Sequence, residues 1–262
     1  MDWQDDGIIL SARRHGESGV IAVLLTENHG RHAGMVRGGT SATKRGILQP
    51  GNRVRAEWRG RLAEHLGAFA LDPMVATAAQ VMDSPLKLAG LSAAAAVAEQ
   101  SLPEREPHPR VYDGFAALIT TLGMEELGIA WVAAYVRWEL GLLADLGFGL
   151  ELESCAATGT VEQLSYVSPR SGRAVSRSAG APYHDKLLCL PKFLGGTGLA
   201  VGDGQQDFDE DAKLRHDLAA GLALTGYFLE THVFGVHGQT SPPARARFVE
   251  RFNRSDTISW GV

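Results

Sequence analysis

Five short runs of apolar or alternating residues, separated by turn-forming residues, fill the first 72 positions of this chain. Such runs, joined by glycine-containing turns, are typical of β-strands. After the second run, Asn28-His29-Gly30 supplies residues that tolerate positive φ, as a tight hairpin requires. We therefore predict a small antiparallel barrel of the OB type. Its expected strands are Gly7–Arg14, Val20–Thr26, His32–Arg37, Arg53–Trp58 and His65–Leu71.

The rest of the chain has mainly helical patterns. Residues 73–83 are expected to form a linker, and Ser84-Pro85 is typical of a helix start, because Ser caps the backbone and Pro fits the first turn. An acidic run that includes Asp207 and Asp209 precedes a further expected helix, where negative charge suits the N-terminal end of the dipole. The helices are expected at about residues 85–102, 110–122, 128–146, 212–233 and 244–252.

A polar stretch at about 150–185, rich in Ser, Gly and Arg, interrupts the helices and is interpreted as a small insertion. The sequence thus predicts an α+β chain. Its expected domains are a barrel over residues 1–80 and a helical domain over residues 81–262 that carries the insertion.

Positive charge is concentrated between Gly30 and Arg61, which hold eight basic residues and one acid, Glu57. The whole chain has 25 Lys and Arg against 30 Asp and Glu, a net charge of -5. Such an asymmetry is typical of a polyanion-binding face within an acidic protein. Alternatively, the charges form only a solvated outer face of the strands.

Motifs of common enzyme classes do not occur in the sequence. It has no phosphate-binding P-loop, no nucleophile elbow and no HExxH motif. The stretch Gly195–Gly198 lacks the lysine of a phosphate loop and is interpreted as a turn. Nothing in the sequence pairs two carboxylates as acid and base. We therefore expect a protein that is not an enzyme.

Zinc and secretion are not expected either. Structural zinc takes four thiolate or imidazole ligands, typically from CxxC pairs, and Cys155 has no second thiol at that spacing. With Cys189 as the other cysteine, there is no disulfide framework. The acidic N-terminus lacks the basic region of a secretory signal, and no apolar run approaches the ~20 residues that span a bilayer. We expect a soluble, cytoplasmic protein.

Several longer motifs follow one another along the chain. The N-terminal motifs are DDGIILSARRHGESGVIAVLLTENHGRHAGMVRGG, ILQPGNRV and EHLG. The C-terminal motifs are WELGLLADLGFGLELESCAATG, YVSPRSGRAVS and LLCLPKFL. In this order they resemble the RecO family of bacterial recombination mediators, and the resemblance extends from residue 2 to about residue 253.

This resemblance implies an N-terminal OB fold and a helical domain, often with an inserted four-cysteine zinc finger. It implies binding of single- and double-stranded DNA, annealing of complementary strands, and association with RecR. It also implies binding to the acidic, hydrophobic C-terminal tail of the single-stranded DNA-binding protein (SSB). Through these contacts, family members help RecA to load at gaps in RecF-pathway repair, which would place this protein at the nucleoid.

The chain departs from the family pattern at the zinc finger. It keeps Cys155, but Thr158, Ser176 and Ala179 stand at the spacings of the other three cysteines. We interpret the insertion as a metal-free remnant that is held by hydrogen bonds and packing.

Basic residues of the barrel are the predicted DNA-binding site, because Lys and Arg neutralise phosphates and release counterions without reading sequence. Trp58 lies on the apolar side of its strand and is expected in the core. The alternative is an adaptor that binds RecR and SSB with little DNA affinity. The predicted site comprises Arg37, Lys44, Arg45, Arg53, Arg55, Arg59 and Arg61, with Arg14 and Arg31 as weaker members.

An SSB tail ends in a carboxylate beside a Phe, so its receptor needs an apolar pocket with a cation at the rim. Arg137 is our candidate for the cation, among Tyr135, Trp138 and Leu142 on one helix. Alternatively, Arg137 snorkels and pairs with an acid on a neighbouring helix.

Overall fold

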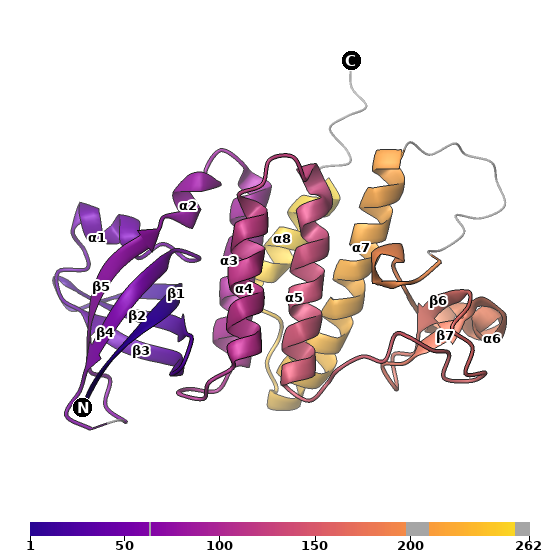
Figure 1. Cartoon of the computed structure of the whole chain (residues 1–262), viewed down its shortest axis with the longest axis horizontal. Coiled ribbons are helices and arrows are strands. Elements are labelled where there is room, and N and C mark those ends of the chain that lie inside the picture. Colours follow the sequence, from indigo (N-terminus) through magenta and orange to yellow (C-terminus); the bar gives the residue numbers. More distant parts are fainter. Residues whose placement is uncertain (63, 198–209, 255–262) are drawn as a thin grey trace, which may run out of the picture. The chain divides into compact units, whose positions relative to one another are not determined.

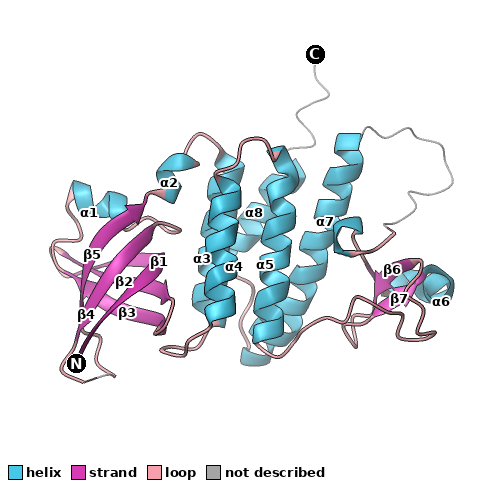
Figure 2. Cartoon of the chain, viewed as in Figure 1, coloured by secondary structure: helices cyan, strands magenta, loops and turns pink. Residues whose placement is uncertain are grey.

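The computed structural model describes residues 1–62, 64–197 and 210–254. Gly198, Asp207 and Asp209, which belong to the glycine-rich stretch and the acidic run, lie outside these residues. The chain divides into two compact units, one of Met1–Glu125 with Pro242–Val262 and the other of Glu126–Ser241. Strands dominate the N-terminal part and helices most of the remainder, which confirms the predicted α+β class (Figure 2).

Five strands of the first unit form a closed barrel in the order β1-β2-β3-β5-β4 (Figure 1). The pairing between β3 and β5 is parallel, at Met35 and Ala68, and the other pairings are antiparallel. The strands are β1 (Asp2–His15), β2 (Gly19–Thr26), β3 (Gly30–Val36), β4 (Arg53–Arg59) and β5 (Ala68–Val75).

The strand boundaries differ from the predicted ones most at the start of β1 and the end of β5. β1 begins at Asp2 rather than Gly7, because its first residues pair with β4, with Trp3 opposite Trp58. β5 continues to Val75, through Pro73, which had been assigned to the linker. Proline lacks an amide proton and is tolerated at irregular places in a sheet. Here Pro73 pairs beside the register shift between Arg53 and Val54.

The barrel core follows the predicted alternation of β4, whose Val54, Ala56 and Trp58 are buried. Trp58 is 1% exposed and donates its indole proton to the carbonyl of Leu66 at 3.0 Å, which confirms its place in the core. The other buried members of this core are Ile9, Val20, Ala22, Leu24, Val36, Leu48 and Phe69.

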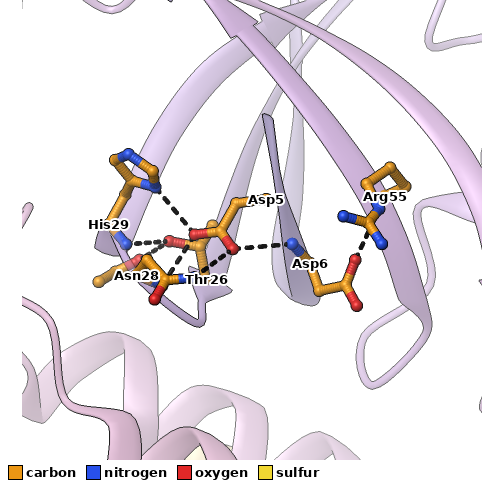
Figure 3. Close-up of polar contacts among 7 residues, drawn as sticks. Asp5, Asp6, Thr26, Asn28, His29 and Arg55 are labelled. Carbon is orange, nitrogen blue, oxygen red and sulfur yellow. Dashed lines mark hydrogen bonds and ion pairs between the residues drawn. The ribbon is translucent and has the colours of Figure 1, made fainter. Parts of the chain in front are cut away.

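A buried carboxylate holds the hairpin between β2 and β3 (Figure 3). Asp5 accepts hydrogen bonds from the backbone and side-chain nitrogens of Asn28, at 2.8 and 3.0 Å, and lies 2.8 Å from Nδ1 of His29. Burial favours a raised pKa for Asp5, but the hydrogen bonds from His29 and Asn28 outweigh it and hold the pKa below its usual value. Gly30 ends the turn with φ of 66°, as predicted.

Three longer helices complete the first unit. Ser84 caps α3 by accepting from the backbone nitrogen of Lys87 at 3.4 Å, with Pro85 in the first turn, as predicted. α3 packs on β1 and on α8, so the C-terminal helix returns to the barrel side. The barrel domain was predicted to end at residue 80, and this boundary stays a prediction. The helices of this unit are α1 (Ala42–Ile47), α2 (Thr77–Gln80), α3 (Pro85–Ser101), α4 (Pro109–Leu122) and α8 (Pro243–Arg254).

The second unit combines two packed helices with a small sheet. α5 (Trp131–Asp145) packs on α7 (Glu210–Phe228), where buried Thr225 donates to the carboxylate of buried Glu139 at 2.5 Å. α7 continues into a π-helical turn over Leu229–Phe234. The predicted insertion lies between these helices. It contains β6 (Leu164–Val167), β7 (Ala174–Ser176) and α6 (Arg177–Gly180). The strand β8 (Leu188–Cys189), just beyond its predicted end, completes a sheet of order β7-β6-β8.

Short 3₁₀ turns connect these elements at Gly128–Ala130, Ala181–Lys186, Lys192–Leu194 and Gly235–His237. Among the described residues, no helix has the length and apolar character that crossing a membrane requires.

His32 is buried among aromatic rings inside the barrel, with 4% of its surface exposed. The ring centroids of Trp58 and Trp3 lie 5.0 and 5.1 Å from it, both edge-on. Neither ring nitrogen has a hydrogen-bond partner within the described ranges. Burial, together with the positive charges of Arg105 and His29, lowers the pKa of His32 to about 4.

We predict that His32 makes the barrel sensitive to acid. Since the folded pKa of about 4 lies below the ordinary value of 6.5, the unfolded chain binds the proton first as pH falls. Stability contributed by neutral His32 is therefore present above about pH 6.5 and lost progressively towards pH 4, by up to ~3 kcal/mol. Urea unfolding of His32→Phe should lack this part of the pH dependence. His65→Phe, at an exposed position, should retain it, and an unchanged profile in His32→Phe would contradict the assignment.

Candidate nucleic-acid interface

The connection between β3 and β4 carries two cations on a short helix. Within α1, none of the side chains is buried, so Lys44 and Arg45 are exposed. Ser41 caps this helix by accepting from the backbone nitrogen of Lys44 at 3.4 Å, and buried Leu48 follows it. The connection over residues 38–52 is thus partly helical, and the helix presents its cations to solvent.

Strand register brings two further cations beside α1. Arg14 pairs with Val20 across β1 and β2, and Val20 pairs with Val36, which Arg37 follows. Lys44 Nζ donates to the carbonyl of Arg37 at 2.5 Å. We call Arg14, Arg37, Lys44 and Arg45 the basic cluster. Its members are exposed and, in the part of the chain that the structure describes, none of them has an ion pair with an acid.

Other predicted DNA-binding residues have partners within the protein. Arg31 donates Nε to the carbonyl of Leu102 at 2.7 Å and lies 3.5 Å from the carboxylate of Glu104. Its side chain is 19% exposed, so it joins β3 to the segment after α3.

Two arginines of β4 pair with nearby acids. Arg55 forms an ion pair with Asp6 at 2.8 Å, without hydrogen-bond geometry at that carboxylate oxygen (Figure 3). Arg59 donates to Glu57 through Nε at 3.0 Å. These cations are partly neutralised before any ligand arrives.

The remaining two residues of the predicted site lie in different surroundings. Arg53 is half-buried beside Tyr112. Burial raises the pKa of Tyr112, and the nearby Arg53 guanidinium opposes that rise. Arg61 is exposed in the turn between β4 and β5, away from the basic cluster along the strand. The structure therefore brings four of the nine predicted residues into one group with free charge.

A cavity beside the basic cluster was not predicted from the sequence. Its volume is about 480 Å³, and Arg14 and Arg45 are among its lining residues. The other lining residues are uncharged and come from β1, β2 and the segments on both sides of α1, so only the strand register unites them. No sequence signal marks such a cavity.

The predicted SSB-tail residues separate into one exposed and three buried side chains. Tyr135 and Leu142 are 0% exposed and Trp138 is 4% exposed, so these three belong to the core of the second unit. Arg137 is exposed, and it donates Nη2 to the carbonyl of Phe193 at 2.8 Å.

The Arg137 guanidinium also lies over the Phe193 ring, 5.6 Å from its centroid. The snorkelling alternative requires an acid as the partner of Arg137. In the described part of the second unit, no acid forms an ion pair with it. The apolar surface next to Arg137 is therefore Phe193, which the sequence analysis did not select.

Cys155 lies where a zinc finger would begin, but hydroxyl groups surround it. The Ser176 backbone nitrogen donates to Sγ at 3.2 Å, and Sγ lies 3.5 Å from the Ser176 hydroxyl. Burial favours a raised pKa for the thiol, but hydrogen bonds with Ser176 and Thr158 outweigh it and lower the pKa to about 6. Within the described residues, no group of three His, Cys, Asp or Glu side chains is placed to hold a metal. One thiol with neutral hydroxyls does not fit the donor set of structural zinc.

Comparisons with known proteins match both parts of the chain. Residues 1–71 match the family described as Recombination protein O N terminal, and residues 82–240 match Recombination protein O C terminal. The chain is 51% identical over 261 residues to the DNA repair protein RecO of Rhodospirillum centenum, covering 99% of this chain and 98% of the relative. It is 49% identical over 260 residues to the protein of the same name from Phenylobacterium zucineum, covering 98% and 100%.

Proposed function

The chain belongs to the RecO family, and from this premise we propose that it is a recombination mediator in DNA repair that acts by binding and not by catalysis. It binds single- and double-stranded DNA, anneals complementary strands, and acts with RecR and SSB to load RecA at gaps in the RecF pathway. We expect it to work at the nucleoid in the cytoplasm.

The barrel supports this proposal as an OB-type DNA-binding domain. Its strand order β1-β2-β3-β5-β4, closed with one parallel pairing between β3 and β5, is what we expect of an OB barrel. In such barrels, oligonucleotides bind to the face of strands 2 and 3 and to the loops after strands 1 and 4. Arg14 lies at the end of β1, next to the first of these loops, and the other members of the basic cluster lie on the connection between β3 and β4.

The observation that carries the proposal is the free charge of the basic cluster. All four members of the cluster are exposed and lack acidic partners in the described structure. No carboxylate of the described structure therefore competes with phosphates for these cations. Cations of this kind bind a backbone by releasing its counterions, without regard to sequence.

Annealing requires that two polyanions approach while their bases remain exposed. The basic cluster lowers the repulsion between strands by neutralising phosphates. Exposed aromatic rings that stack strongly on bases would compete with pairing, and the barrel instead buries Trp58. No bond is made or broken, so no catalytic residue is required.

The competing proposal is an adaptor that binds RecR and SSB with little DNA affinity. The net charge of -5 favours it, because most of the surface repels DNA. Salt-dependent DNA binding distinguishes the two proposals.

We predict that single-stranded DNA binding falls steeply with salt and depends on the basic cluster. Each of Arg37→Ala, Lys44→Ala and Arg45→Ala should weaken binding and reduce the slope of log K against log salt by about one. Fluorescence anisotropy of a labelled strand, paired with an annealing assay, measures both effects.

Arg110→Ala is the matched control, because Arg110 is exposed on α4, outside the predicted site. It should leave the salt slope unchanged. Absence of binding by the unaltered protein at low salt would exclude the mediator and favour the adaptor.

We expect Arg137 to receive the carboxylate of the SSB tail, with Phe193 beside it as apolar surface. Arg137→Ala should weaken binding of an acidic peptide that ends in Phe by about ten-fold, since a charge-assisted hydrogen bond is lost. Isothermal titration calorimetry measures the affinity. Arg177→Ala, an exposed cation on α6, serves as the control, and unchanged affinity in Arg137→Ala would remove the residue from the site.

The insertion is proposed to fold without zinc, with hydrogen bonds to Cys155 in place of metal bonds. Because Ser176 contacts the thiol, the variant Thr158→Cys, Ser176→Cys, Ala179→Cys should bind one Zn²⁺, or Co²⁺ with a thiolate absorption band. Adding Cys155→Ser to this variant should weaken metal binding. Cys155-dependent zinc in the unaltered protein would contradict the proposal.

A further inference from the structure

The cavity beside the basic cluster combines an apolar lining with two cations. It lies where β1 and β2 meet the segments on both sides of α1. Its volume of about 480 Å³ is within the range of about 300–1,000 Å³ that small-molecule sites occupy. The lining residues are Ser11, Ala12, Arg14, Val20, Gly39, Thr40, Arg45, Leu48, Gln49 and Pro50.

The apolar part of the lining suits a flat ring. Val20 and Leu48 are buried and belong to the barrel core, and Pro50 extends the same surface. None of the described residues that line the cavity is aromatic, so on these residues a base would stack on an arginine plane or lie on aliphatic carbon. This surface is too apolar to be a site for phosphate alone.

The charged part of the lining suits phosphate. Arg14 comes from β1 and Arg45 from α1, and both are exposed without an acidic partner in the described structure. The nearby carboxylate of Glu99 accepts from Ser11 at 2.9 Å and pairs with Arg13 at 3.4 Å, so its charge is compensated.

Polar groups for a base edge are present as well. The side-chain nitrogen Nε2 of Gln49 donates to the backbone carbonyl of Arg45 at 2.8 Å. The side-chain oxygen Oε1 of Gln49 can therefore accept a hydrogen bond from a ligand. The Ser11 hydroxyl, which donates to Glu99, can still accept a hydrogen bond.

We propose that this cavity holds one unpaired nucleobase of a DNA strand, with the adjoining phosphates on Arg14 and Arg45. The inference rests on the proposed function, and it specifies which part of a DNA strand is bound beside the basic cluster, namely one unpaired base with its phosphates. A base inside a duplex is paired and stacked, so it enters the cavity only from a single strand. The cavity thus gives single strands an advantage that phosphate contacts alone do not supply. A free mononucleotide also carries a base and a phosphate, so it is the alternative ligand for this cavity.

The test compares a short single strand with the same strand made entirely of abasic sites. The unaltered protein should bind the base-bearing strand about five-fold more tightly, a modest value because no aromatic ring stacks on the base. Equal affinity for both strands, with binding still dependent on salt, would overturn the base site and leave the proposed function intact. Absence of binding to either strand would overturn both.

Two variants fill the cavity from opposite walls without removing a cation. Ala12→Phe acts from β1 and Gln49→Phe from the segment after α1, and both positions are exposed. Each variant should bind both strands equally, with the salt slope of the unaltered protein. Ala70→Phe, at an exposed position of β5 outside the cavity, should keep the five-fold preference. If both filled variants keep it too, the cavity is not the base site.

A competition arm identifies the source of the ligand. Deoxyadenosine monophosphate should displace the base-bearing strand only weakly, because it lacks the further phosphates that the basic cluster binds. Displacement at micromolar concentration, abolished in Ala12→Phe, would instead assign the cavity to free nucleotide and overturn the proposal for a strand.

Discussion

Closure of the barrel depends on one strand that pairs with two neighbours along different parts of its length. Residues 2–8 of β1 pair with β4, and residues 7–15 pair with β2. The register shift between Ile9 and Ser11 lets the strand bend from one partner to the other. The part beyond this bend carries Ser11, Ala12 and Arg14, which line the cavity. The same bend that closes the core therefore places a cation next to α1.

Alternation of residue types was sufficient to predict most strands, but not the beginning of β1. Its sequence, DWQDDG, has no apolar alternation, because the inward position is taken by Asp5, a buried acid. The burial of that acid depends on the hairpin, where Asn28 and His29 supply hydrogen bonds from 23 and 24 residues away along the chain. A local pattern cannot report such a partner.

The sequence could not rank the predicted DNA-binding residues for the same reason. It identifies which residues are cationic, but not which of them have a distant partner in the fold. It ranked Arg14 and Arg31 alike, as weaker members of the predicted site. However, Glu104 lies 73 residues from Arg31 along the chain, and only the fold brings the two together. The four residues of the basic cluster differ from Arg31, Arg55 and Arg59 in having no acid partner among the described residues, a property that only the folded surface shows.

The paired arginines explain how a chain of net charge -5 presents a positive face. Asp6, Glu57, Glu99 and Glu104 each lie beside an arginine, and at physiological salt, charges further than about 8 Å away are largely screened. Pairing therefore compensates the charge of these four acids, which lowers their repulsion of a polyanion at the basic cluster. Under the proposed function, Arg31, Arg55 and Arg59 would support DNA binding without touching DNA, because each compensates an acid that repels a polyanion.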